Sequence, residues 1–311
     1  MDNSIEEEQI ISEIPNKDDA FEENLNHSTL YYNNMKIAKS YNIPTFDPVK
    51  ELNDKRNFSM IICSKRRTGK SIFMLDLCHK IKNWYITGYV FSMTADLQKD
   101  MYDFVNKKNV FNSFNEEKLQ EIWDKQEKMV MAMRTAKVKE EEIPHVLIVL
   151  DDVVSDPRVR KSEILNRYFV AGRHLKFAVI VISQTFTGVP PMLRTNCDIS
   201  VAFYLDSQDN REAFAKQYLS TKNKNIGIML FEKITTEKEY QCIVCMNCNI
   251  SNDPECTVRK YIAKAKVPKF KVGKNDIKNL YVLDAFVEDL NNNKKVELNI
   301  SKSNGRTIKL K

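Results

Sequence analysis

The sequence predicts an α/β protein in which a mostly parallel central sheet is flanked by helices. From residue 57 onward, short apolar runs alternate with amphipathic stretches, which is the pattern of strands joined by helices. One run, Val146 to Leu150, is continuously apolar, as a strand buried on both faces requires. The composition, 42% apolar and 29% charged, fits a chain that buries a large core and excludes fibrous and wholly disordered proteins.

Five strands follow clearly from the apolar runs, and two more are weaker candidates. The clear strands are Phe58 to Cys63, Tyr89 to Met93, Val146 to Leu150, Phe177 to Ser183 and Ile199 to Tyr204. The weaker candidates are Ile228 to Phe231 and Cys242 to Met246. Residues 116–138, between the second and third strands, carry apolar side chains at helical spacing, so we expect a helix that packs by one stripe.

Charge and pattern divide the chain into three predicted parts. Residues 1–26 form an acidic arm that we expect to be disordered, because residues 1–25 hold nine acids against one lysine. Residues 27–250 form the main domain. Residues 251–311 form a basic C-terminal subdomain or tail, which has an amphipathic stretch at 281–290. The net charge of +6 suits a polyanionic partner, although an A+T-rich genome would produce the same Asn- and Lys-rich composition.

The sequence also predicts the compartment in which the chain works. Its longest apolar run, Phe177 to Ile182, is six residues, far below the roughly 20 that cross a bilayer as a helix, so we expect no membrane span. The N-terminus is acidic where a leader would be basic, so we expect an intracellular protein that is not secreted. Seven cysteines, an odd number, indicate free thiols in such a chain.

A P-loop follows the first strand directly, with serine in place of its first glycine. Its residues are Ser64, Lys65, Arg66, Arg67, Thr68, Gly69, Lys70 and Ser71, and a helix-like run continues over residues 72–82. The N–H groups of such a loop cradle phosphate oxygens. Lys70 would reach the β and γ phosphates of ATP, and the Ser71 hydroxyl would bind Mg²⁺. The basic residues at the tip of the loop, Lys65, Arg66 and Arg67, form either a solvated surface patch or a surface that faces nucleic acid or a neighbouring subunit's nucleotide.

Two adjacent carboxylates end the most apolar strand. Asp151 and Asp152 would repel each other unless a cation or a proton is shared, and ligands bind at the carboxyl ends of such strands. Asp151 would then hold the Mg²⁺ shell, while Asp152 would orient and polarise the attacking water. The alternative is that the two aspartates begin a surface turn. The next strand stops at Gln184, whose amide could contact the γ phosphate or the water.

The ordered set of motifs resembles one superfamily of ATPases. After the P-loop and the Asp-Asp strand come Gly172-Arg173-His174, the strand that ends in Ser183-Gln184, and Pro191-x-x-Arg194-x-Asn196. This combination is similar to the FtsK/HerA superfamily of DNA-pumping ATPases. Within it, the match is nearest to the genome-packaging ATPases of poxvirus-like and other large double-stranded DNA viruses. The resemblance covers residues 57–204, about half of the chain.

The resemblance implies a RecA-like (ASCE) P-loop NTPase fold for residues 27–250. It also implies ATP hydrolysis that drives double-stranded DNA into a capsid, and a homo-oligomeric ring of about five or six subunits. The partners would be DNA and a capsid or portal component, in the host cytoplasm, a viral factory or the virion. Family usage further suggests an arginine finger supplied in trans, for which Arg173 is the first candidate and Arg194 the second. Either arginine could instead be a structural ion-pair partner.

Several alternatives stay open from the residues alone. A nucleotide or nucleoside kinase would share the P-loop, and a DNA-binding scaffold with a degenerate ATPase fold is encouraged only by Ser64. A helicase or plasmid-mobilising ATPase would use the same chemistry. Four cysteines, Cys242, Cys245, Cys248 and Cys256, have the count for a thiolate metal site. Their spacing fits common sites poorly, and two of them would fall on opposite faces of a strand.

Overall fold

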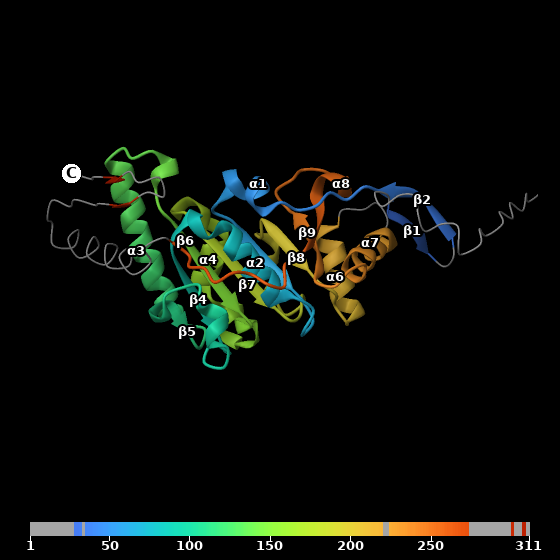
Figure 1. The fold of residues 1–311 in the computed structure, drawn as a ribbon, viewed down its shortest axis with the longest axis horizontal. Coiled ribbons are helices and arrows are strands. Elements are labelled where there is room, and N and C mark those ends of the chain that lie inside the picture. The colour runs from blue at the N-terminus through green and yellow to red at the C-terminus, as the bar shows by residue number, and fades with distance from the viewer. Residues whose placement is uncertain (1–27, 33–34, 220–223, 274–299, 302–306, 309–311) are drawn as a thin grey trace, which may run out of the picture.

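The computed structural model describes residues 28–32, 35–219, 224–273, 300–301 and 307–308. Within these residues, eight strands form the central sheet in the order β10-β9-β8-β3-β7-β6-β4-β5 (Figure 1). The strands are β3 (Ser59–Cys63), β4 (Tyr85–Ser92), β5 (Val110–Phe111), β6 (His145–Asp151), β7 (Phe177–Ser183), β8 (Ile199–Ala202), β9 (Gln241–Met246) and β10 (Val258–Ile262). Strands β3 to β8 are mutually parallel, whereas β9 runs antiparallel to β8 and β10 antiparallel to β9.

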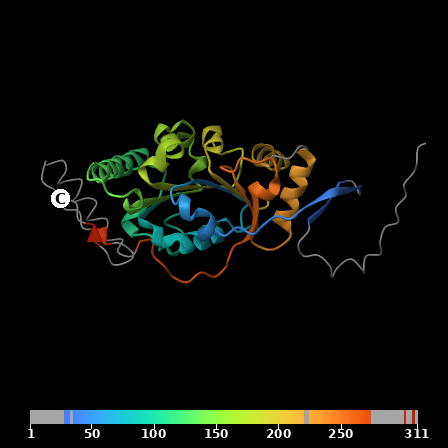
Figure 2. The same cartoon turned by 90° about the horizontal axis from the view of Figure 1, so that it is seen from above.

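Helices cover both faces of the sheet. They are α1 (Pro48–Leu52), α2 (Lys70–Ile81), α3 (Glu116–Thr135), α4 (Glu163–Ala171), α5 (Pro191–Thr195), α6 (Gln208–Tyr218), α7 (Lys224–Thr236) and α8 (Pro254–Thr257). Helices α1 and α2 lie on one face of the sheet, and α3, α4, α6 and α7 lie on the other (Figure 2). Every residue of β6 and β7 is buried, which is why these strands read as continuous apolar runs.

Short 3₁₀ helices and small hairpins complete the described fold. The 3₁₀ helices are η1 (Asn53–Lys55), η2 (Lys82–Trp84), η3 (Lys99–Tyr102), η4 (Lys107–Asn109), η5 (Glu140–Glu142), η6 (Val153–Ser155), η7 (Pro157–Lys161) and η8 (Gly172–Leu175). Strands β1 (Ser28–Tyr32) and β2 (Met35–Tyr41) pair antiparallel, and β1 lies beside α7 (Figure 1). Strands β11 (Ile300–Ser301) and β12 (Thr307–Ile308) form a second antiparallel pair.

The sequence predicted the alternation of strands and helices correctly, but one predicted strand is wrong. Residues 228–231 lie inside helix α7, because Leu230, Phe231 and Ile234 are buried together on one helical face. A four-residue apolar run cannot by itself distinguish a strand from the buried stripe of a helix. The second predicted strand begins four residues earlier than expected, at Tyr85. The helix predicted over residues 116–138 is confirmed as α3, whose buried side chains form one stripe.

The weaker candidate strand at Cys242 to Met246 is confirmed as β9, but the strand that follows it in the sheet was not predicted. Strand β10 continues the sheet past residue 250, into the segment that the sequence assigns to a C-terminal subdomain or tail. The acidic arm at residues 1–26 and the amphipathic stretch at 281–290 lie outside the described residues. Of the helices that are described, none combines the length and the apolar character that crossing a bilayer demands.

Candidate active site

The candidate site lies at the carboxyl edge of the parallel strands. Strands β3, β7 and β6 are neighbours, so the residues that follow them meet although they are far apart in the sequence. Backbone hydrogen bonds continue past the strand ends, from Ser64 N to Ser183 O (3.1 Å) and from Asp152 N to Ile182 O (3.1 Å). The P-loop, the two aspartates and Gln184 therefore share one rigid edge.

The P-loop connects β3 to α2 and is braced from within. The Ser64 hydroxyl lies 2.7 Å from the Thr68 hydroxyl and donates to Lys65 O, while Thr68 Oγ1 donates to the same carbonyl. Ser64 is fully buried and does not have a positive φ, so this first position does not require glycine. The serine therefore replaces the glycine without strain and adds a hydroxyl that fixes the loop.

Glycine is required at the end of the loop. Gly69 has a φ of 122°, and a Cβ there would lie 2.8 Å from Phe203 Cε1. Both the backbone conformation and the lack of space exclude a larger side chain. The turn at Gly69 starts α2, so that Lys70 occupies its first position and Ser71 its second.

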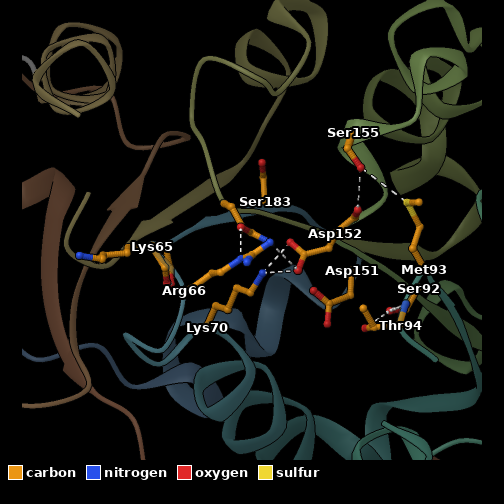
Figure 3. Close-up of polar contacts among 12 residues, drawn as sticks. Lys65, Arg66, Lys70, Ser92, Met93, Thr94, Asp151, Asp152, Ser155 and Ser183 are labelled. Atoms are coloured by element: carbon orange, nitrogen blue, oxygen red, sulfur yellow. Dashed lines mark hydrogen bonds and ion pairs between the residues drawn. The ribbon is translucent and has the colours of Figure 1, made fainter. Parts of the chain in front are cut away.

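Lys70 and Asp152 are in direct contact. The Nζ atom of Lys70 lies 2.5 Å from both carboxylate oxygens of Asp152, and both side chains are largely buried (Figure 3). Asp152 has a φ of 55°, a left-handed conformation that costs a non-glycine residue roughly 1 kcal/mol or more. Strain of this kind at the end of a central strand is common at functional sites.

Gln184 and Arg66 extend this contact into a series of hydrogen-bonded side chains. Gln184 Nε2 donates to Asp152 Oδ2 (3.2 Å), and Arg66 Nε donates to Gln184 Oε1 (2.9 Å). The Arg66 contact fixes the amide orientation, since its N–H must face the carbonyl oxygen of Gln184. Lys65 points away from this group, as Figure 3 shows, and forms an ion pair with Asp206 (2.9 Å).

Asp151 is held by a different partner, Tyr102 of η3. The Tyr102 hydroxyl donates to Asp151 Oδ2 (2.7 Å) and lies 3.0 Å from Ser92 Oγ. Burial raises the pKa of Asp151, and the neighbouring Asp152 carboxylate adds to that rise, while the Tyr102 hydrogen bond and Lys70 oppose it. Its second oxygen, Oδ1, is buried with no hydrogen-bond partner among the described residues. A buried carboxylate oxygen in this condition is suited to a divalent cation.

The two candidate arginine fingers lie in different places in the structure. Arg173 is in η8, before β7 begins, and so lies at the opposite edge of the sheet, roughly 20 Å from the P-loop by strand length. It is exposed and lines a cavity of about 300 Å³ with Lys55, Asp198 and Cys248. Arg194 is half-buried, with its guanidinium 4.9 Å from the ring centre of Phe186.

The four cysteines at 242–256 do not converge in the structure. Cys242 packs into the core on the α2 side of the sheet, whereas Cys245 packs into the core on the other side. Burial raises the pKa of both thiols. Cys248 and Cys256 are exposed. Side chains on opposite faces of one strand cannot bind the same ion, so a four-thiolate site is excluded.

Sequence reasoning missed Tyr102 and the contact of Arg66 with Gln184. Tyr102 lies 49 positions from Asp151, and nothing in the pattern around it distinguishes it from a core tyrosine. Arg66 belongs to a basic run of three, and the sequence does not show which member turns toward the site. Both contacts depend on how loops from separate strands pack.

The fold and the site define a P-loop NTPase of the RecA-like type, as predicted. Within that class, a sequence model of the family described as Poxvirus A32 protein matches residues 46–269, and the chain belongs to this family. The predicted kinship with poxvirus-like genome-packaging ATPases is thereby confirmed at the level of the family.

Individual relatives are distant in sequence. The DNA packaging protein OPG160 of variola virus is 24% identical over 176 residues, which are 57% of this chain and 64% of that protein. The uncharacterized protein 075L of invertebrate iridescent virus 6 is 25% identical over 182 residues, 57% of this chain and 67% of that protein. Among solved structures, the conjugation coupling protein TcpA of pCW3, in its monomer form with ATPγS, has a similar fold. It superposes with a TM-score of 0.50 at 12% identity, over 86% of this chain and 73% of that one.

Proposed function

We propose that this protein is an ATP-hydrolysing motor that moves double-stranded DNA and packages a viral genome into a capsid. The observation that carries the proposal is the meeting of the P-loop with Asp151, Asp152 and Gln184 at one edge of the sheet. Membership in the Poxvirus A32 family supports DNA as the substrate of the motor, because the variola relative is named a DNA packaging protein.

ATP binding begins at the P-loop. Backbone N–H groups of the loop and of the first turn of α2 bind the phosphates, and Lys70 leaves Asp152 to contact the β and γ phosphates. Ser71 and Asp151 are the residues that would hold Mg²⁺, and the orphaned Asp151 Oδ1 supports this assignment. When bound, the ion would neutralise charge on the β and γ phosphate oxygens.

Asp152 and Gln184 act on the attacking water. Once Lys70 has moved to the phosphates, a carboxylate oxygen of Asp152 accepts a proton of the water, which orients and polarises it for attack. Gln184 is held through its oxygen by Arg66, so its N–H group stays directed toward Asp152 and the water. The hydrogen bonds from Arg66 through Gln184 to Asp152 thus link the tip of the P-loop to the hydrolytic carboxylate.

A neighbouring subunit would complete the site. Arg173 lies at the edge of the sheet opposite its own P-loop, so it can act only on the nucleotide of another subunit. A homo-oligomeric ring of about five or six subunits would bring the two edges together. Such a ring would act with a capsid or portal component, in the host cytoplasm, a viral factory or the virion. Arg194 is the second candidate, although its stacking on Phe186 favours a structural role.

Steady-state ATP hydrolysis with and without long double-stranded DNA tests the proposal. We expect the wild type to hydrolyse ATP in a Mg²⁺-dependent reaction that DNA stimulates, with less stimulation at moderate than at low salt. Asp152→Asn should lose hydrolysis by roughly a hundredfold or more, since it cannot accept a proton from water.

The matched control is Asp156→Asn, which neutralises a half-buried carboxylate four residues away that pairs with Arg158 and caps η7, a cap that asparagine also provides. This variant should hydrolyse ATP at the wild-type rate. Hydrolysis that survives in Asp152→Asn would remove the assigned role of this carboxylate. Robust hydrolysis that is indifferent to DNA would leave an ATPase but contradict a DNA motor.

A further inference from the structure

The placement of the hydrolytic groups fixes the direction in which a nucleotide must lie. Asp152 and Gln184 follow β6 and β7, which are on one side of β3 in the sheet. The γ phosphate must therefore point toward β7 and β6. Since the phosphate chain runs along the P-loop, the nucleoside must lie on the other side of β3, toward β8 and β9.

An aromatic residue lies on that side, against the P-loop itself. Tyr240 precedes β9, which is antiparallel to β8 with Ile243 opposite Ala202. This register places Tyr240 at the same edge of the sheet as the P-loop. Its ring packs on Gly69, where a Cβ would lie 3.1 Å from Tyr240 Cδ1. The ring is half-buried, and the buried Phe203 approaches the same Cβ position of Gly69.

The backbone at Tyr240 is held in an uncommon conformation. Its φ is 55°, a left-handed value that is rare for a bulky residue. Two backbone hydrogen bonds keep it there, from Ala263 N to Tyr240 O (3.0 Å) and from Gln241 N to Lys238 O (3.2 Å). An asparagine or glycine would fit this turn with less strain, so the aromatic residue is kept at a conformational cost. Its ring packs against the core on the α2 side of the sheet, beside Gly69.

We propose that Tyr240 stacks on the base of the bound nucleotide and so makes the site prefer a nucleoside triphosphate to a bare triphosphate. This inference rests on the proposed function and adds the residue that recognises the nucleoside. A base presents a flat π face that stacks well on an aromatic ring. Because every base has such a face, Tyr240 selects for the presence of a base more than for its identity.

Equilibrium binding of ATP and of inorganic tripolyphosphate to the full chain tests this role. Tyr240→Asn removes the ring and tolerates the left-handed backbone, while Tyr240→Phe keeps the ring and is the matched control. We expect Tyr240→Asn to weaken ATP binding about tenfold, the size of one lost stack, and to leave tripolyphosphate binding unchanged. Tyr240→Phe should bind both as the wild type does.

Two results would overturn the inference while leaving the proposed function intact. In one, Tyr240→Asn weakens ATP and tripolyphosphate equally, which would mean that the ring only supports the P-loop. In the other, ATP binding is unchanged in Tyr240→Asn. A wild-type chain that fails to bind ATP would overturn the proposed function first, and this inference with it. Circular dichroism of each variant verifies that the fold is retained.

Discussion

Lys70 of the P-loop and Asp152 at the end of β6 form an ion pair in which one ammonium contacts both oxygens of the carboxylate. In the proposed mechanism Lys70 contacts the β and γ phosphates, which would draw its ammonium away from Asp152. Nucleotide binding would then separate the pair and free the carboxylate proposed to act on water. The contact would thus couple occupation of the P-loop to activation of Asp152.

The first prediction concerns Lys70. Lys70→Ala should lower ATP hydrolysis by roughly a hundredfold or more, because it removes a cation that stabilises charge on the transferred phosphoryl group. The measurement is the steady-state release of phosphate. Lys118→Ala, which breaks an exposed ion pair with Glu121 on α3, should retain wild-type turnover. Turnover that persists in Lys70→Ala would contradict the P-loop assignment.

The second prediction concerns Tyr102 and the metal. Tyr102→Phe keeps the ring but removes the hydroxyl that donates to Asp151. That hydrogen bond lowers the pKa of Asp151, so its loss favours the protonated acid and weakens Mg²⁺ binding. Losing a hydrogen bond to a charged group costs about 1.5–3 kcal/mol, so the Mg²⁺ concentration for half-maximal hydrolysis should rise roughly tenfold or more.

The control for Tyr102 is another buried tyrosine hydroxyl. Tyr168→Phe removes the hydroxyl that donates to Leu119 O, far from the carboxyl edge, and should leave the Mg²⁺ dependence unchanged. If the two variants shift the Mg²⁺ dependence equally, Tyr102 does not act through Asp151.

The third prediction separates the two candidate arginines. Arg173→Ala should bind ATP normally but lose turnover, and mixing it with Asp152→Asn subunits should restore part of the activity, since each subunit supplies what the other lacks. Arg194→Ala should instead lower the melting temperature, because its guanidinium packs on Phe186. Mixed subunits that recover no activity would argue against Arg173 as a finger in trans.

The fourth prediction concerns the pH dependence of stability. Burial, with smaller effects from Lys176 and Arg56, lowers the pKa of His145 to about 4, while a nearby Glu140 opposes the shift. The folded state thus keeps His145 neutral, whereas the unfolded chain protonates it near its ordinary pKa of about 6.5. Above that pH the histidine has no pH-dependent effect. Stability is lost as the pH falls from about 6.5 toward 4.

The loss for this one histidine should be on the order of 3 kcal/mol. Chemical denaturation at pH 7 and pH 4.5 measures it, and His145→Gln serves as the comparison. The variant should lose less stability than the wild type over this interval. Equal losses in the two proteins would show that His145 does not titrate as described.

Local patterns were enough to predict much of this fold. Strands β6 and β7 are buried on both faces, which requires continuous runs of apolar residues. Such runs are visible in the sequence without any knowledge of the fold. The run at 228–231 was wrongly predicted as a strand because a short apolar run also occurs in a partly buried helix such as α7. Strand β10 is the outermost strand of the sheet and is less buried, so it carries Arg259 and Lys260 and lacks a strong apolar pattern.

The sequence by itself determined most of the chemical groups that the candidate site contains. The P-loop, the Asp151–Asp152 pair and Gln184 each follow a strand, and strand ends in a parallel sheet must meet at one edge. Only the tertiary structure decided how these groups pair, because the contacts join segments separated by 32 to 118 positions. It assigned Tyr102 to Asp151, Arg66 to Gln184 and Lys70 to Asp152, and it placed Arg173 at the far edge. Side-chain direction at a loop depends on packing against distant strands, which no local pattern encodes.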